Sequence, residues 1–187
     1  MSELLRRMWG AARLHADTYE EVEADRRAIG QSTAVVLAAC AAGALSEWFR
    51  TEPAGLAPDG LILRVAIAGA EPLVLWVGGS AVAFMVGASF FRGPSTQTDF
   101  GEVLRTTGFA FTPALLRVLV FVPPPALGLS LDLVGRFWTF VAVVVAIRQA
   151  LDFTTLRAVG TFGAAALMLW LMLWGASVAP LPFPFPR

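Results

Sequence analysis

Three ionisable residues lie within long apolar stretches of the sequence, and they are the residues with most chemical potential. Glu47, Glu71 and Arg117 are each flanked by aliphatic and aromatic residues. A charge at the centre of a membrane span costs at least about 2.5 to 3.5 kcal/mol unless it is paired or reaches the interface. We therefore expect Arg117 to form an intramembrane ion pair with Glu71 or Glu47. Two other readings stay open: the long Arg117 side chain extends to the membrane surface, or it belongs to a substrate path.

The sequence lacks the residue sets on which most catalytic sites depend. His15 is the only histidine and precedes the first apolar stretch, so a histidine-activated nucleophile or a metal cluster has no basis within the apolar part. Glu47 with Glu71 is the one carboxylate pair available for acid–base work. We predict that the protein is not an enzyme and has no catalytic residues, cofactor or metal site.

Five apolar stretches must position these charges. A helix needs about 20 apolar residues to cross the hydrocarbon core of a bilayer. The chain is 57% hydrophobic with a mean hydropathy of +0.68, and its charged fraction of 15% is well below the roughly 25% of soluble domains. The sequence predicts an all-α integral membrane bundle of five transmembrane helices. The stretches are Ile29 to Phe49, Leu61 to Phe91, Leu104 to Val122, Leu133 to Ile147 and Ala158 to Ala179.

A polar segment precedes the first stretch and has helical periodicity. Apolar residues recur at intervals of three and four from Leu4 to Val22, so we predict one amphipathic helix from Ser2 to Asp25. This helix lies in the headgroup layer or packs against the loop ends of its own bundle, and both readings stay open. We divide the chain into a cytoplasmic amphipathic segment at 1–28, a five-helix transmembrane domain at 29–179 and a proline-rich tail at 180–187.

The arginines predict the orientation of the chain. Basic residues near span ends are retained in the cytoplasm, and nine of the fourteen arginines flank one side. The amino terminus is predicted inside and the carboxyl terminus outside. Four tryptophans agree, because they fall in the outer parts of their spans: Trp48, Trp76, Trp138 and Trp174. All basic residues are arginine, which suits a bacterial inner-membrane protein, and the net charge of zero argues against a nucleic-acid partner.

Two prolines predict departures from straight helices. The stretch from Leu61 to Phe91 is about 46 Å long as a helix, so we favour a break at Pro72 that leaves 61–70 as a separate outer helix. One long kinked helix is the alternative. Pro113 should kink the third span and free the Phe109 carbonyl, which Thr112 or a neighbouring helix then satisfies.

Polar residues gather at the predicted cytoplasmic ends of the spans. Arg148 and Asp152 are four apart and would face each other on a continuing helix. The set, which we name the cytoplasmic cap, is a solvated surface or a docking surface for a cytoplasmic protein or for the chain's own amphipathic helix. Its members are Arg92, Asp99, Glu102, Arg105, Arg148, Gln149, Asp152 and Arg157.

Several short motifs together resemble a known family. They are Ile29-Gly-Gln31, Gly108-Phe-Ala-Phe-Thr-Pro113, Phe137-Trp138, Val145-Ala-Ile-Arg148-Gln149-Ala-Leu151 and Thr155-Leu-Arg157-Ala. From about residue 20 to 178 the chain is similar to the bacterial branch of the Yip family, five-span proteins named for interaction with Ypt/Rab GTPases. The resemblance implies a cytoplasmic amino-terminal segment and a non-enzymatic membrane role. The residues that match best are Gly108, Pro113, Trp138, Arg148, Gln149 and Arg157.

These observations lead to two functional hypotheses. The first is a membrane scaffold, adaptor or accessory subunit that binds a protein partner through the cytoplasmic cap and the amphipathic helix. The alternative is a small transporter or channel that uses Glu47, Glu71 and Arg117. Membrane lipids are expected partners, and small residues spaced by four, as at Gly79, Ala83 and Gly87, also permit a homo-oligomer.

Overall fold

The structure, a computed structural model, describes residues 2–51, 58–90 and 99–178. Every element among these residues is a helix, which confirms the all-α fold class. The α-helices are α1 (Glu3–Ala12), α2 (Ala16–Ala24), α3 (Ala28–Thr51), α4 (Pro58–Phe90), α5 (Phe100–Phe109), α6 (Pro125–Ala150) and α7 (Thr155–Val178), and a 3-10 helix, η2 (Thr112–Phe121), follows α5. Arg92 and the tail at 180–187 lie outside the described residues.

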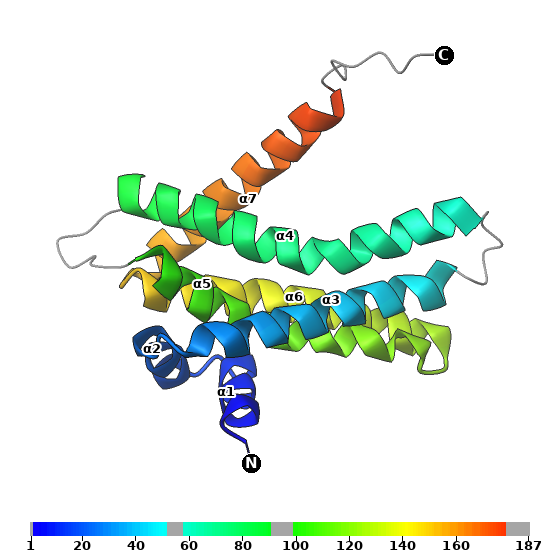
Figure 1. Ribbon diagram of the computed structural model, residues 1–187, viewed down its shortest axis with the longest axis horizontal. Helices are drawn as coiled ribbons and strands as arrows, with labels where there is room; N and C mark the ends of the chain where they lie inside the picture. The colour runs from blue at the N-terminus through cyan, green and yellow to red at the C-terminus, as the bar shows by residue number, and fades with distance from the viewer. Residues whose placement is uncertain (1, 52–57, 91–98, 179–187) are drawn as a thin grey trace.

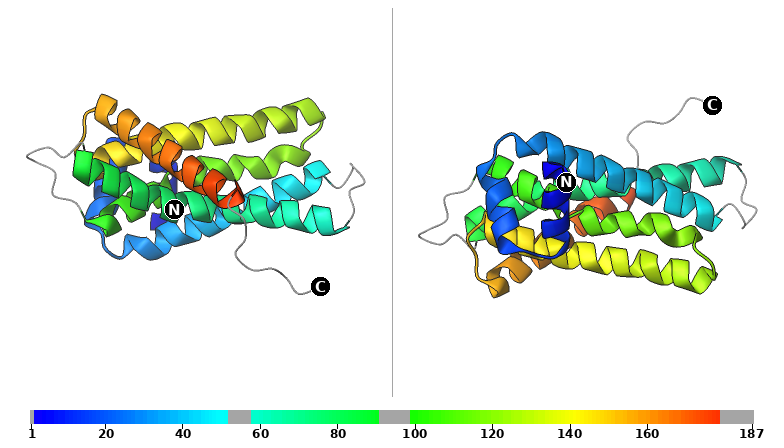
Figure 2. Two further views of the ribbon diagram at one scale, coloured as in Figure 1. Left: turned by 90° about the horizontal axis from the view of Figure 1, so that it is seen from above. Right: turned by 90° about the horizontal axis from the view of Figure 1, so that it is seen from below.

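The long helices form a membrane bundle. Helices α3, α4 and α6 run roughly along the long axis of the molecule, with α3 beside α4 and with η2 between α3 and α6, whereas α7 leaves the bundle at an angle (Figures 1 and 2). Within the described part of the chain, four helical segments are long and apolar enough to cross a membrane: Ala28–Arg50, Asp59–Gly87, Phe100–Phe121 and Pro125–Ala150. Helix α7 contains a further apolar segment, Thr155–Met168. The protein is therefore an integral membrane protein.

Helix α4 continues through Pro72, so the predicted break that isolates 61–70 is wrong. Pro72 has no N–H for the carbonyl of Ala68, yet packing against α3 keeps the helix intact. Gly43 of α3 lies directly over that carbonyl, and a Cβ at this position would come within 2.5 Å of the oxygen. A long helix with an internal proline bends instead of ending when its neighbours hold it.

The third span changes helix type near Pro113. Helix α5 ends at Phe109, and the chain continues as η2 with the proline in its first turn. The Thr112 hydroxyl donates a hydrogen bond to the Phe109 carbonyl at 2.7 Å, which is the acceptor that Pro113 leaves free. The span is thus two short helices joined at the proline and not one kinked α-helix.

The amino-terminal segment is two helices, so the prediction of one helix from Ser2 to Asp25 is wrong. Leu14 has a φ of 61°, a left-handed conformation that reverses the chain after α1. The Leu14 and His15 N–H groups donate to the carbonyls of Ala11 and Gly10, both at 3.0 Å. This is the Schellman arrangement that ends many helices, formed here without the usual glycine.

An arginine holds the two short helices together and to the bundle. Arg7 of α1 is only 3% exposed, and its guanidinium contacts three carboxylates and one amide. The partners are Glu3 at 2.7 Å and Glu21, Asp25 and Gln31, each at 2.9 Å. Because Gln31 belongs to α3, this network joins the amino-terminal helices to the first span.

A tyrosine extends the contact of α2 with the bundle. Tyr19 is fully buried, and its hydroxyl donates to the carbonyls of Ala11 at 3.1 Å and Ala142 at 3.5 Å. Burial raises its pKa above the usual range of tyrosine. The segment therefore packs on its own bundle, while Leu5 and Trp9 of α1 are 52% and 61% exposed. This outward face has the apolar character that suits a headgroup layer.

Two of the four tryptophans do not lie where we predicted. Trp138 donates from Nε1 to the Ala12 carbonyl at 2.7 Å, and Trp76 donates to the Leu104 carbonyl at 2.8 Å. Both indoles therefore lie in the half of the bundle that carries α1 and α5. The expectation that these two tryptophans mark the outer interface is wrong, so the predicted orientation rests mainly on the arginines.

Arg7→Ala should weaken the docking of α1 and α2. It removes a buried cation from three carboxylates, and we expect a loss of about 2 kcal/mol in local stability. Hydrogen exchange of the full chain in detergent should show faster exchange in residues 3–24 with α6 unchanged. Arg6 contacts the same Glu21 but is 53% exposed, so Arg6→Ala is the matched control and should change exchange little. Equal increases in exchange for Arg7→Ala and Arg6→Ala would contradict the conclusion that the buried contacts of Arg7 hold these helices in place.

Candidate functional site

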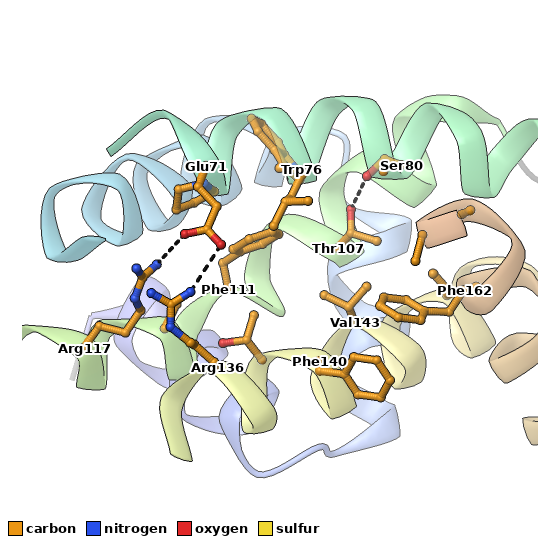
Figure 3. Close-up of a pocket in the computed structure, with 18 residues that line it drawn as sticks. Glu71, Trp76, Ser80, Thr107, Phe111, Arg117, Arg136, Phe140, Val143 and Phe162 are labelled. Carbon is orange, nitrogen blue, oxygen red and sulfur yellow. Dashed lines mark hydrogen bonds and ion pairs between the residues drawn. The ribbon is translucent and has the colours of Figure 1, made fainter. Parts of the chain in front are cut away.

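Four charged side chains meet inside the bundle. Glu71 comes from α4, Arg117 from η2, and Asp132 and Arg136 from α6. Arg117 lies 3.3 Å from Glu71 and 3.2 Å from Asp132, and Arg136 lies 3.3 Å from Glu71 and 3.0 Å from Asp132. The four residues thus form a closed ring in which acids and bases alternate, which we name the charge ring. Figure 3 shows both arginines reaching Glu71.

Two members of the charge ring are buried, so each needs a partner of opposite charge. Arg117 is 4% exposed and Asp132 is 2% exposed. A charge removed from water in this way is tolerated only when opposite charges and hydrogen bonds replace its solvation. Asp132 accepts hydrogen bonds from both arginines and from the Ser46 hydroxyl of α3 at 3.2 Å. One carboxylate therefore links α3, η2 and α6.

The sequence positions the ring through two glycines of α6. A Cβ at Gly128 would overlap the backbone of Val120, and one at Gly135 would lie 3.1 Å from the Pro113 carbonyl. The absence of side chains at these positions lets η2 approach α6 closely. Asp132 and Arg136 are four apart on the same helix, so both point at the approaching η2.

The predicted ion-pair residues are only partly brought together. The structure places Arg117 beside Glu71, as expected, whereas Glu47 forms ion pairs with Arg50 at 3.1 Å and Arg64 at 3.7 Å. Sequence reasoning missed Asp132 and Arg136. We began the fourth span at Leu133, which assigned Asp132 to a connector, but α6 begins at Pro125. The spacing of an acid and a base by four residues was the available signal.

A cavity of about 240 Å³ opens from the charge ring. The charged groups lie at one end, and aromatic and aliphatic side chains line most of the remainder, together with the hydrogen-bonded Ser80 and Thr107 (Figure 3). Helices α4, α5, α6 and α7 and η2 supply the walls. The lining residues are Glu71, Pro72, Leu75, Trp76, Gly79, Ser80, Thr107, Phe111, Ala114, Arg117, Arg136, Thr139, Phe140, Val143, Ile147, Phe162, Ala165 and Ala166.

Part of the cytoplasmic cap holds the amino-terminal helices. Arg105 donates to the Glu23 carbonyl at 2.5 Å, and Gln149 donates to the Glu20 carboxylate at 3.1 Å. Asp99 and Glu102 close the start of α5 as a capping box, with each side chain accepting from the other's backbone N–H at 2.9 Å. These four residues therefore stabilise the fold of the chain itself.

The remaining described members of the cap are exposed. The expected pairing of Arg148 with Asp152 on a continuing helix is wrong, because α6 ends at Ala150 and Asp152 adopts a φ of 50°. No ion pair joins these two residues, both of which the structure describes. Arg148, Asp152 and Arg157 are all exposed at this end of the bundle. Among the described residues, no group of three or more histidine, cysteine, aspartate or glutamate side chains is arranged to hold a metal ion.

Comparison with known families assigns the chain. The sequence profile of the Yip1 domain matches residues 14–177, which covers most of the chain. The chain belongs to the Yip1 family. Members of the Yip1 family are generally non-enzymatic. No curated protein and no solved structure gives a significant match.

The residues that carry the Yip1 resemblance have structural roles in this protein. A Cβ at Gly108 would come within 2.5 Å of the Ser32 side chain, so this glycine lets α5 pack closely on α3. Pro113 begins η2, Trp138 holds the end of α1, and Gln149 contacts α2. Most of the Yip1 motif residues therefore position helices, whereas Arg148 and Arg157 remain exposed.

We predict strong energetic coupling within the charge ring of the Yip1 domain. Arg117→Gln should destabilise the fold by about 3 kcal/mol, because it leaves a buried Asp132 with one fewer cation. Adding Asp132→Asn should cost less than the sum of the two single changes, by at least about 1 kcal/mol. Thermal unfolding in detergent measures all three variants. Arg136→Gln is the control, since its side chain is 38% exposed and should cost less. Strictly additive losses would show that the two side chains do not interact.

We also predict pH-dependent docking of α2. Burial raises the pKa of Glu23 to about 7, with further contributions from Glu102, Asp152 and Glu20, and Arg105 opposes the shift. Because the ordinary value is 4.5, protonated Glu23 favours the docked state. Its contribution is complete below about pH 4.5 and is lost as the pH rises through 7. Hydrogen exchange of α2 should accelerate across this range.

Glu23→Gln should remove most of this dependence, since glutamine carries no titrating group. Glu21 does not contribute to the change between pH 4.5 and 7. The hydrogen bond from Arg6 outweighs burial and lowers the pKa of Glu21 to about 2. The stability that Glu21 contributes is present above about pH 4.5 and is lost only as the pH falls towards 2. A glutamine variant that keeps the full dependence would exclude Glu23 as its source.

Proposed function

We propose that the protein is a non-enzymatic scaffold or adaptor of the bacterial inner membrane that binds a protein partner. In this proposal the amino terminus is cytoplasmic, the carboxyl terminus is outside, and the chain acts alone, as a homo-oligomer or as an accessory subunit of a larger membrane complex. The observation that carries the proposal is the docking of α1 and α2 on the end of the bundle. Arg7, Tyr19 and Gln149 hold them there.

The docked helices turn one end of the bundle into a fixed polar surface. Glu20 of α2 contacts Gln149 near the end of α6, and Glu20, Arg148, Asp152 and Arg157 are all exposed, so the surface presents both signs of charge. Charges arranged on a rigid surface favour one partner orientation and suppress wrong partners. Family membership supports the same role, because Yip1 domains are generally non-enzymatic.

Charge reversal on this surface tests the proposal. The full chain is purified from its native membrane in gentle detergent, and co-purifying proteins are quantified by mass spectrometry. Arg148→Glu and Arg157→Glu should each lower recovery of a specific partner by about fivefold, since misplaced charges at an interface are strongly unfavourable. Arg64→Glu is the matched control, because Arg64 is 59% exposed at the opposite end of the bundle. Purification of the lone chain, or equal loss in the control, would reject the scaffold role.

The cavity beside the charge ring supports a second candidate function, a small transporter or channel. Glu71 and Arg117 line it, and charges at this depth are typical of substrate paths. Glu47 was the third residue of this hypothesis, but its ion pairs with Arg50 and Arg64 lie away from the cavity lining. Solute flux into reconstituted vesicles that Arg117→Ala abolishes would favour this candidate over the scaffold.

A further inference from the structure

The cavity has two ends of different chemistry. At one end the Glu71 and Arg136 side chains are 37% and 38% exposed, so an acid and a base both present surface to it. At the other end the walls are mainly apolar, with Phe140, Val143 and Phe162 facing inward, and the hydroxyls of Ser80 and Thr107 hydrogen-bond to each other (Figure 3). A ligand that matches both ends must be amphiphilic.

The charge ring selects the kind of headgroup. Its two acids and two bases balance, so a ligand with a net negative charge would leave one carboxylate short of a cation. A headgroup with both charges keeps the balance. The contacts of Glu71 are 3.3 Å long, beyond the 2.7 to 2.9 Å typical of strong charge-assisted bonds. Glu71 therefore has room to accept from a further N–H donor.

The size and position of the cavity point to a lipid. Its volume of about 240 Å³ is below the roughly 300 to 1,000 Å³ of sites that enclose a whole drug-sized ligand, so it holds part of a larger molecule. Arg136 lies about 16 Å along α6 from Pro125, and its guanidinium reaches back to Asp132, towards that end of the helix. Helix α7 crosses α4 at an angle and does not run along it (Figure 2).

The apolar wall of the cavity offers dispersion contacts to a ligand that lies along it. Gly79 of α4 marks a position where the cavity is open. It lines the cavity, and a Cβ on it would meet no atom within 4 Å. In a membrane an acyl chain is the nearest material that can fill such a space.

We propose that the cavity binds a zwitterionic phospholipid with a primary ammonium group, such as one with a phosphoethanolamine headgroup. The phosphate contacts Arg136, the ammonium donates to Glu71, and one acyl chain lies along the aromatic and aliphatic wall. A quaternary ammonium lacks the N–H donors that Glu71 accepts. This site is independent of the scaffold role, and a bound lipid would occupy the path that a transported solute needs.

Native mass spectrometry of the full chain tests the proposal. The protein is delipidated in detergent and titrated with phosphatidylethanolamine, phosphatidylcholine or phosphatidylglycerol of identical acyl chains. We expect phosphatidylethanolamine to bind at least about tenfold more tightly than either of the others, which corresponds to about 1.4 kcal/mol. Equal binding of the three lipids would overturn the assignment of the headgroup. Preference for phosphatidylglycerol would show that the site selects anions instead.

A cavity-filling variant locates the lipid without disturbing the charges. Gly79→Leu places a side chain in the cavity and also removes a helix-interior glycine, so the fold is expected to persist. Binding of phosphatidylethanolamine should fall by at least about tenfold. Gly163→Leu is the matched control, because Gly163 also has open space and does not line the cavity. Unchanged binding in Gly79→Leu, with its melting temperature retained, would place the lipid elsewhere and refute the proposal.

Discussion

The burial of charge within an apolar bundle is the constraint on which the rest of this structure depends. Arg117 and Asp132 are almost fully buried, and neither is tolerable in lipid without the other. Satisfying them requires η2 and α6 to pack backbone to backbone, which Gly128 and Gly135 permit. It also requires α4 to bring Glu71 to the same level. One electrostatic requirement thus fixes the relative positions of three spans.

A second polar network does the same at the end of the bundle. Arg7 gathers carboxylates from α1 and α2 and the Gln31 amide of α3, while Tyr19 reaches the backbone of α6. The amino-terminal helices are therefore part of the folded unit and not a separate appendage. Their position leaves an exposed apolar edge at Leu5 and Trp9, which has the character that suits a headgroup layer.

The sequence predicted features that follow from large energies and missed those that follow from packing detail. The helical class, the membrane character of the bundle and the approach of Arg117 to Glu71 follow from the cost of polar groups in lipid. The turn at Leu14 was missed because a leucine takes the left-handed position that glycine usually holds. The continuity of α4 was missed because a proline disfavours a helix locally, whereas α3 supports it from outside.

Pro72 and Gly43 together have a mechanical consequence. A proline within a long span is often a flexible joint, since one rung of the hydrogen-bond ladder is missing. Here the Ala68 oxygen, to which Pro72 cannot donate, faces the backbone of Gly43, and the neighbouring helix supports α4 at this point. The two halves of α4 can change their relative tilt only if α3 slides as well. Rigidity at this point is shared between two spans, so a force on either one is transmitted to both.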